Sequence, residues 1–139
     1  MRSRLPPEVA DFPRPMPFSA TEKPLVLVAE DEFVTRQAAI DMLREAGFAA
    51  LTATNGTEAI RLLEDCREIR AVLTDIDMPG GPDGIRLAAC IQHRRPDVHV
   101  IIVSGKVIPV EGDLPSGSLF FAKPYNESEL IDALRGLLA

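Results

Sequence analysis

Five short apolar runs alternate with segments of helical periodicity along most of the 139-residue chain. The first run, LVLVA at residues 25–29, is apolar at every position, which is typical of a strand buried on both faces of a sheet. Helical segments after each of the first three runs provide the crossovers that parallel strands require. We therefore predict an α/β fold with a doubly wound, five-stranded parallel sheet. Strands are expected at 25–29, 48–53, 71–74, 98–103 and 119–122, and helices at 31–46, after Asn55, at 84–95 and after Asn126.

Residues 1–23 differ from the rest of the chain. They contain five prolines and mixed charges without any periodicity, which predicts a Pro-rich, flexible N-terminal tail before a single domain at 24–139. A docking arm that uses Phe12, Met16 and Phe18 is the alternative interpretation of this tail.

The net charge of −6 argues against a nucleic-acid partner. No apolar run reaches membrane-spanning length, and no apolar signal region opens the chain, so we expect a cytoplasmic protein without a membrane anchor. Two cysteines, Cys66 and Cys90, lie in helical patterns and are interpreted as buried small side chains in a reducing compartment.

Polar side chains follow four of the five predicted strands. Because the carboxyl ends of parallel strands meet at one edge of the sheet, where ligands bind in such folds, these side chains should share one crevice. Each has an ordinary explanation by itself, such as a helix cap or a turn, but the combination favours a functional site. The residues are Glu30, Asp31 and Glu32 after the first strand, Asp75 and Asp77 after the third, Ser104 after the fourth and Lys123 after the fifth.

Clustered carboxylates repel one another, and burial raises their pKa values unless a cation is present. Mg²⁺ suits such a site because it binds one or two carboxylates together with waters and phosphate oxygens. A carboxylate beside that metal, with a lysine and a hydroxyl to bind phosphoryl oxygens, is the arrangement needed to form an aspartyl phosphate. Asp75 is the candidate for the phosphorylated residue.

The ordered segments LVLVAEDE, LTDIDMP…DG, IIVSG and AKP resemble the receiver domain of bacterial two-component response regulators, over residues 24–139. The resemblance implies a flavodoxin-like receiver fold. It also implies that Asp75 accepts a phosphoryl group from a sensor histidine kinase or a histidine phosphotransfer protein.

The same resemblance implies roles for the other strand-end residues. Asp31, Asp75 and the backbone carbonyl of Asp77 would bind Mg²⁺, with Glu30 acting through water. Lys123 and the Ser104 hydroxyl would bind the phosphoryl group, and Ser104 and Phe120 would form the switch. The bond before Pro124 is expected to be cis. These roles belong to Glu30, Asp31, Asp75, Asp77, Ser104, Phe120 and Lys123.

Three features depart from the family pattern. The loop between Asp75 and Gly84 is one residue longer than usual, and Phe120 has no hydroxyl. The segment KVIPVEGDLPSG at 106–117 contains two prolines and two glycines, which disfavour a helix. We expect the fourth helix to be shortened or replaced by a loop, with at most one turn at 110–114. The apolar side chains expected to tuck against the sheet edge are Val107, Ile108, Val110 and Leu114.

The predicted function is that of a single-domain response regulator, not an enzyme beyond assisting its own phosphorylation and dephosphorylation. It would signal through contacts with an unknown output protein or act as a phosphate sink, as a monomer or weak dimer. One alternative is a receiver-like adaptor that needs no phosphorylation. A less favoured alternative is a phosphohydrolase of the haloacid dehalogenase type, suggested by the Asp75-Ile76-Asp77 triplet, although in those enzymes the nucleophile lies on the first strand.

Overall fold

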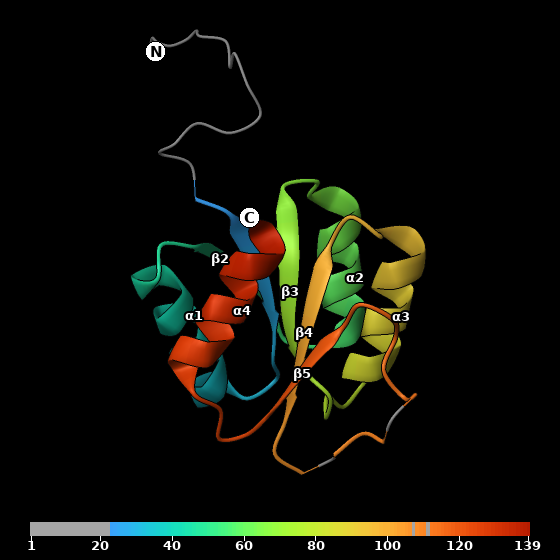
Figure 1. Cartoon of the computed structure of the whole chain (residues 1–139). Coiled ribbons are helices and arrows are strands. Elements are labelled where there is room, and N and C mark those ends of the chain that lie inside the picture. The colour runs from blue at the N-terminus through green and yellow to red at the C-terminus, as the bar shows by residue number, and fades with distance from the viewer. Residues whose placement is uncertain (1–22, 107, 111) are drawn as a thin grey trace, which may run out of the picture.

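The computed structural model describes residues 23–106, 108–110 and 112–139, and it shows a five-stranded parallel sheet between two layers of helices (Figure 1). The strand order is β2-β1-β3-β4-β5, which confirms the predicted doubly wound, flavodoxin-like fold. The predicted tail lies outside the described residues, apart from Lys23. The elements are β1 (Leu25–Ala29), α1 (Phe33–Glu45), β2 (Ala49–Ala53), α2 (Gly56–Asp65), β3 (Ile69–Asp75), α3 (Gly84–Arg94), β4 (His99–Ser104), β5 (Leu119–Ala122) and α4 (Glu127–Leu138).

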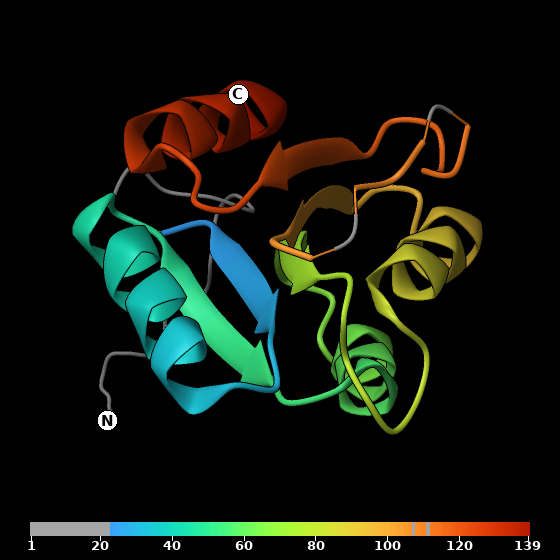
Figure 2. The ribbon, with the colours of Figure 1, turned by 90° about the horizontal axis from the view of Figure 1, so that it is seen from below.

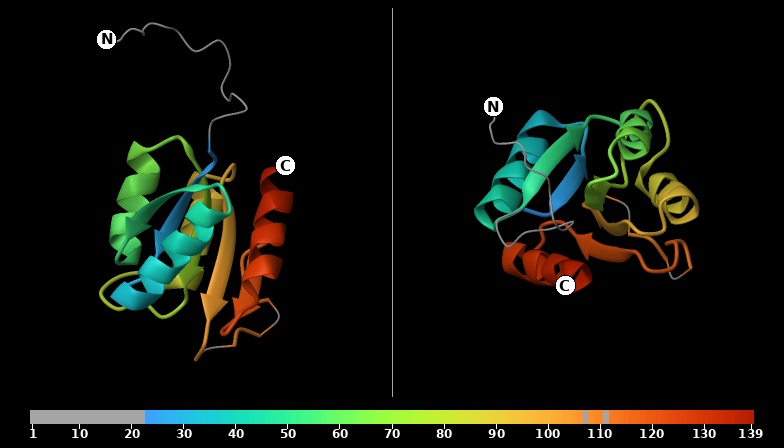
Figure 3. Two further views of the ribbon diagram at one scale, coloured as in Figure 1. Left: turned by 90° about the vertical axis from the view of Figure 1, so that its left-hand side faces the viewer. Right: turned by 90° about the horizontal axis from the view of Figure 1, so that it is seen from above.

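The sheet is covered on both faces, as its all-apolar strands require (Figure 3). Alternate residues of β4 show this, because Val100 and Ile102 pack with the α2 and α3 side while Ile101 and Val103 pack with the α1 and α4 side. Within the described residues no helix is long and apolar enough to span a membrane.

Side-chain caps fix where the helices begin. Asn55 and Asn126 accept hydrogen bonds from the backbone N–H groups of Glu58 and Glu129, and the two helices begin after these asparagines, as predicted. The predicted start of the first helix at residue 31 is wrong. Glu32 caps α1 by accepting from the N–H of Thr35, so Asp31 stays outside the helix and exposed.

No helix forms between β4 and β5 in the described residues, which confirms the predicted loss of the fourth helix. Two separate turns close instead: the Asp113 N–H donates to the carbonyl of Val110 (3.0 Å), and the Ser118 N–H donates to the carbonyl of Pro115 (3.1 Å). The expected burial of this segment is partly wrong. Leu114 packs against the core on the α2 and α3 side, but Ile108 and Val110 are 64% and 67% exposed. Without a helical period their side chains share no common face with Leu114. Val107 lies outside the described residues.

The buried guanidinium of Arg95 joins the α3–β4 turn to the α2–β3 turn. Its side chain is 13% exposed and pairs with Asp97, and its hydrogen bonds hold the pKa of the Asp97 carboxyl below its usual value. Arg95 also donates to four backbone carbonyls between the end of α2 and the start of β3, where carbonyls at a helix end lack intrahelical donors. These acceptors are Leu63 (2.7 Å), Cys66 (3.3 Å), Arg67 (3.2 Å) and Ile69 (3.3 Å).

We expect Arg95→Met to lower the free energy of unfolding by about 2 kcal/mol, because several partly buried carbonyls lose their donor. The neighbouring Arg94 pairs only with Glu64 in the described contacts, and both side chains are 56% exposed. Arg94→Met is therefore the matched control and should cost less than about 0.5 kcal/mol. Urea unfolding of both variants checks this, and equal losses would contradict the role assigned to Arg95.

Candidate functional site at the carboxyl ends of the strands

An open cleft of about 540 Å³ lies at the carboxyl ends of β1, β3, β4 and β5. These strand ends face the viewer in Figure 2. The parallel strands bring together here six of the seven predicted site residues, although they are far apart in the sequence. The exception is Phe120, which is half-buried and packs against the core on the α2 and α3 side. The lining residues are Glu30, Asp31, Glu32, Thr35, Asp75, Asp77, Pro79, Ser104, Gly105, Lys106 and Lys123.

The ammonium group of Lys123 contacts two carboxylates on the floor of this cleft. Lys123 Nζ lies 3.0 Å from Asp75 Oδ2 and 3.5 Å from Glu30 Oε1. The two carboxylate side chains are largely withdrawn from solvent, at 13% exposure for Asp75 and 6% for Glu30. The peptide bond that follows Lys123, between Lys123 and Pro124, is cis, as predicted. These contacts join the ends of β1, β3 and β5 through one positive charge.

Burial and neighbouring charges shift the pKa values of two of these groups. Burial is the main reason why the pKa of the Glu30 carboxyl is raised, and the nearby Asp75 carboxylate raises it further. Burial by itself would lower the pKa of Lys123. Its hydrogen bond and attraction to Asp75, with a further contribution from Glu30, outweigh that effect and raise the pKa above the usual value.

The first turn of α1 fixes the backbone that carries Glu30 and Asp31. Arg36 Nη1 donates to the carbonyl oxygens of Glu30 (3.0 Å) and Asp31 (3.3 Å). The Glu32 N–H also donates to Glu30 Oε2 (3.1 Å). The sequence offered no signal for Arg36, because its partners are backbone carbonyls, which every residue has.

Backbone contacts hold the end of β3. The Asp77 N–H donates to Asp75 Oδ1 (3.3 Å), and the exposed Asp77 carboxylate lies 3.8 Å from Lys106 Nζ. Gly84 is a second residue that sequence reasoning missed. A Cβ there would lie 2.1 Å from the carbonyl oxygen of Asp75, so only glycine lets α3 begin this close to the site.

Ser104 ends β4 inside the cleft and is 1% exposed. Its carbonyl accepts from the backbone N–H of Lys123 (2.9 Å), which fixes the spacing between the ends of β4 and β5. The Ser104 side chain is therefore positioned by the hydrogen-bonded end of a strand rather than by a loop.

The oxygen atoms of the cleft are suited to a hard divalent cation. In the part of the chain that the structure describes, no group of three or more His, Cys, Asp or Glu side chains is arranged to hold a metal ion. Asp31 and Asp75 nevertheless both line the cleft, and Mg²⁺ commonly binds through one or two carboxylates while it keeps several waters. The donor set thus fits Mg²⁺ better than a metal that needs an all-protein cage.

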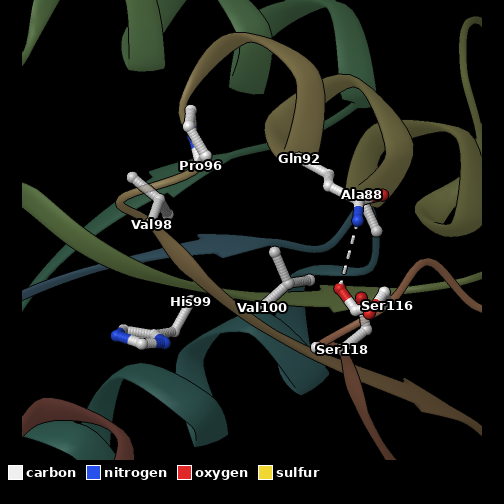
Figure 4. Close-up of a pocket in the computed structure, with 9 residues that line it drawn as sticks. Ala88, Gln92, Pro96, Val98, His99, Val100, Ser116 and Ser118 are labelled. Atoms are coloured by element: carbon white, nitrogen blue, oxygen red, sulfur yellow. Dashed lines mark hydrogen bonds between the residues drawn. The ribbon is translucent and has the colours of Figure 1, made fainter.

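A second cavity, of about 240 Å³, lies at the opposite end of β4 (Figure 4). It exists because β5 begins opposite Ile101 and leaves the first residues of β4 without a neighbour on that side. Ala88, Val98 and Val100 line it, and Gln92 Nε2 donates to the carbonyl of Ser116 (3.4 Å) across it. It holds no carboxylate or lysine, so the strand-end cleft is the better candidate for chemistry.

Comparisons with known proteins agree with this geometry. The family model for the response regulator receiver domain matches residues 26–135. A putative response regulator NtrX-like of Rickettsia bellii is 30% identical over 114 residues, 79% of this chain and 24% of that protein. The aerobic respiration control protein ArcA of Escherichia coli is 29% identical over 121 residues, 85% of this chain and 50% of that protein. The chain thus spans half or less of these relatives.

Solved structures show the same fold. A response regulator receiver protein from Sinorhizobium medicae superimposes with a TM-score of 0.78 at 28% identity, over 86% of this chain and 97% of that one. A response regulator receiver protein from Pseudomonas putida superimposes with a TM-score of 0.74 at 30% identity, over 83% of this chain and 98% of that one.

The raised pKa of Glu30 leads to a pH-dependent stability. The folded protein binds a proton at Glu30 more tightly than the unfolded chain, whose carboxyl has the ordinary pKa of 4.5. The Glu30 contribution to the unfolding free energy therefore falls as the pH rises from below 4.5 through the folded-state pKa. We expect the stability of Glu30→Gln relative to the wild type to increase over this interval, in urea unfolding without divalent metal. Glu45→Gln, at the exposed end of α1, is the control. A constant difference for Glu30→Gln would contradict the assignment.

Proposed function

Because the chain belongs to the family of response regulator receiver domains, we propose that it accepts a phosphoryl group on Asp75 in two-component signalling. The observation that carries this proposal is the Asp75 carboxylate, held 3.0 Å from Lys123 Nζ in an open cleft that Ser104 also lines. Its donor would be a sensor histidine kinase or a histidine phosphotransfer protein.

In the proposed transfer, the P–N bond of a phosphohistidine breaks while a P–O bond forms to Asp75, and the histidine nitrogen keeps the bonding electron pair. Lys123 already contacts the Asp75 carboxylate and would attract the phosphoryl oxygens. The Ser104 hydroxyl would donate a hydrogen bond to one of them. Asp31, Asp75 and the Asp77 carbonyl would hold Mg²⁺, with Glu30 acting through water. The metal supplies positive charge that offsets the charge on the phosphoryl group.

The order of the elements separates this function from a phosphohydrolase of the haloacid dehalogenase type. Asp75 ends the third strand of the chain, and Glu30 and Asp31 follow the first. The acids therefore precede the proposed acceptor, which is the reverse of the order expected for such an enzyme. The protein would act as a signalling phosphoacceptor, either for an output protein or as a phosphate sink.

The phosphoacceptor can be tested with acetyl phosphate and Mg²⁺. The wild type should gain the mass of one phosphoryl group, whereas the nearly isosteric Asp75→Asn should gain none. Asp77→Asn is the matched control, because the Asp77 side chain is 60% exposed and only its backbone carbonyl is assigned to the metal. It should still be labelled, and removal of Mg²⁺ should abolish labelling. Labelling of Asp75→Asn would refute the assignment, and an unlabelled wild type would favour the phosphorylation-independent adaptor.

The segment at 105–118, which stands where the family has its fourth helix, is the proposed reporter of phosphorylation. Its first residues follow Ser104, and Lys106 pairs with Asp77 at the cleft. Leu114 and Phe120 pack partly buried against the same core. A phosphoryl group that draws Ser104 towards it would therefore disturb both ends of the segment, and the Phe120 ring would move with it.

Hydrogen exchange measures this switch. We expect amides at 105–118 to exchange faster than those of α2 and α3, and their exchange to change when beryllofluoride mimics the phosphoryl group. The α2 amides serve as the internal control and should change little. Exchange at 105–118 as slow as in the helices, and identical in both states, would argue against the segment as the reporter.

A further inference from the structure

The cavity at the amino end of β4 has a size and a lining that suit one large apolar side chain. Its volume, about 240 Å³, is smaller than the pockets of about 300–1,000 Å³ in which drug-sized molecules usually bind. Its lining combines the apolar residues Ala88, Val98 and Val100 with the polar residues Gln92 and Ser118. Figure 4 shows Gln92 and Val100 on opposite sides of the cavity. An apolar side chain carried on an extended backbone would match both kinds of lining.

The edge of β4 beside this cavity can pair with a further segment. Because β5 begins opposite Ile101, β3 is the one described strand that pairs with His99 and Val100. Successive residues of a strand direct their backbone N–H and C=O groups to opposite sides. The Ser104 carbonyl accepts from Lys123 on the β5 side, so the backbone groups of Val100, four residues earlier, face that side as well. An extended segment placed in line with β5, before its first residue, would meet this strand edge.

The chain enters β1 at the same end of the sheet as this cavity (Figure 1). Val26, Ala71 and His99 are paired in one row across β1, β3 and β4, so the start of β1 is level with the start of β4. Three strand spacings, about 15 Å, separate β1 from the line of β5. The five residues from Phe18 to Lys23 can span up to about 17 Å. Counting back from β1, Phe18 is the first large apolar residue, and it is within reach of the cavity.

The segment at 12–18, FPRPMPF, has proline at every second position. Each proline fixes its own φ and restricts the preceding residue to extended backbone, so the segment loses little conformational freedom on binding. In an extended chain the three prolines remove N–H donors from one edge only, while Arg14, Met16 and Phe18 keep theirs on the other. The pattern is therefore typical of a segment that pairs with one strand edge and leaves its outer edge blocked.

We propose that the segment at 12–18 docks at this cavity within its own chain, with the Phe18 ring between Val100 and Gln92 and its backbone beside the start of β4. Phe12 and Met16, which share a face with Phe18 in an extended segment, extend the contact along the mouth of the cavity. A link as short as five residues gives an effective concentration on the order of mM, which favours docking within one chain over docking on a second copy.

The docked segment also contacts the proposed reporter of phosphorylation, and this part of the inference rests on the proposed function. Ser116 and Ser118 line the cavity and belong to the segment at 105–118, and Gln92 Nε2 donates to the Ser116 carbonyl (3.4 Å). A rearrangement of 105–118 on phosphorylation of Asp75 therefore changes the wall against which Phe18 lies. The docked segment stabilises the unphosphorylated arrangement, and by linkage phosphorylation weakens the docking.

NMR spectroscopy of the isotope-labelled full chain tests the docking. Without divalent metal, the wild type should show nuclear Overhauser effects between the Phe18 ring protons and the Val100 methyl protons, and Phe18→Ser should remove them. The same substitution should speed amide hydrogen exchange at Val100 and Ser118 by about tenfold, because a buried phenylalanine is lost. Leu5→Ser, which lies before the segment, is the matched control and should change neither signal. Unchanged α2 amide signals show that both variants are folded.

Beryllofluoride with Mg²⁺ tests the coupling to the cleft. In the wild type it should weaken the Phe18–Val100 effects by about twofold or more and move the amide signals at 98–100 towards their positions in Phe18→Ser. Because linkage is reciprocal, Phe18→Ser should bind beryllofluoride about fivefold more tightly than the wild type, whereas Leu5→Ser should bind it equally.

A wild type without Phe18–Val100 effects would overturn the docking and leave the proposed phosphoacceptor function untouched. In a mixture of labelled and unlabelled chains, effects found only between different chains would overturn docking within one chain in favour of a second copy. Effects that stay the same when beryllofluoride binds would overturn the coupling to phosphorylation. If beryllofluoride changes no signal around Asp75 in the wild type, the proposed function fails, while the effects measured without metal still decide the docking.

Discussion

The contact of one ammonium group with two carboxylates links the fold of this protein to its proposed chemistry. Glu30 and Asp75 lie at the ends of neighbouring strands, where their largely buried carboxylates would repel each other. The Lys123 ammonium, at the end of β5, contacts both carboxylates and offsets this repulsion. The contact therefore forms only when the carboxyl ends of β1, β3 and β5 lie together at one end of the sheet. A phosphoryl group on Asp75 would add negative charge where the cleft lining offers only two lysines, so the contacts of Lys123 would have to redistribute.

The two ends of the sheet serve different purposes. At the amino ends, Arg95 of the α3–β4 turn donates to backbone carbonyls between α2 and β3 and contributes to stability. At the carboxyl ends, carboxylates are crowded at the site proposed to accept a phosphoryl group, and their mutual repulsion opposes stability. Because the strands between the two ends are buried and apolar, structural changes at the carboxyl ends need not destabilise the amino ends. A receiver domain can in this way combine a site of crowded charges with a stable sheet.

Much of this could be predicted from sequence, for identifiable reasons. The all-apolar run of β1 admits few alternatives to a central parallel strand, and parallel strands necessarily bring Glu30, Asp75 and Lys123 to one edge. The start of α1 was mispredicted because Glu32, one of three successive acids, provides the cap. Arg36 and Arg95 could not be found, since an arginine that donates to backbone carbonyls looks like any solvated arginine. The exposure of Ile108 and Val110 was missed because a segment without periodicity does not reveal which side chains face the core.

The segment in place of the fourth helix contributes one described side chain, Leu114, to the core. Most substitutions along it would therefore leave the folded state nearly as stable as before. If this segment contacts a partner as the proposed reporter, recognition and structural integrity are encoded by different residues, and mutations could change one without endangering the other. Duplicated copies of such a gene could acquire new partners by drift in this segment alone. A helix in the same place would oblige every such change to preserve a buried face.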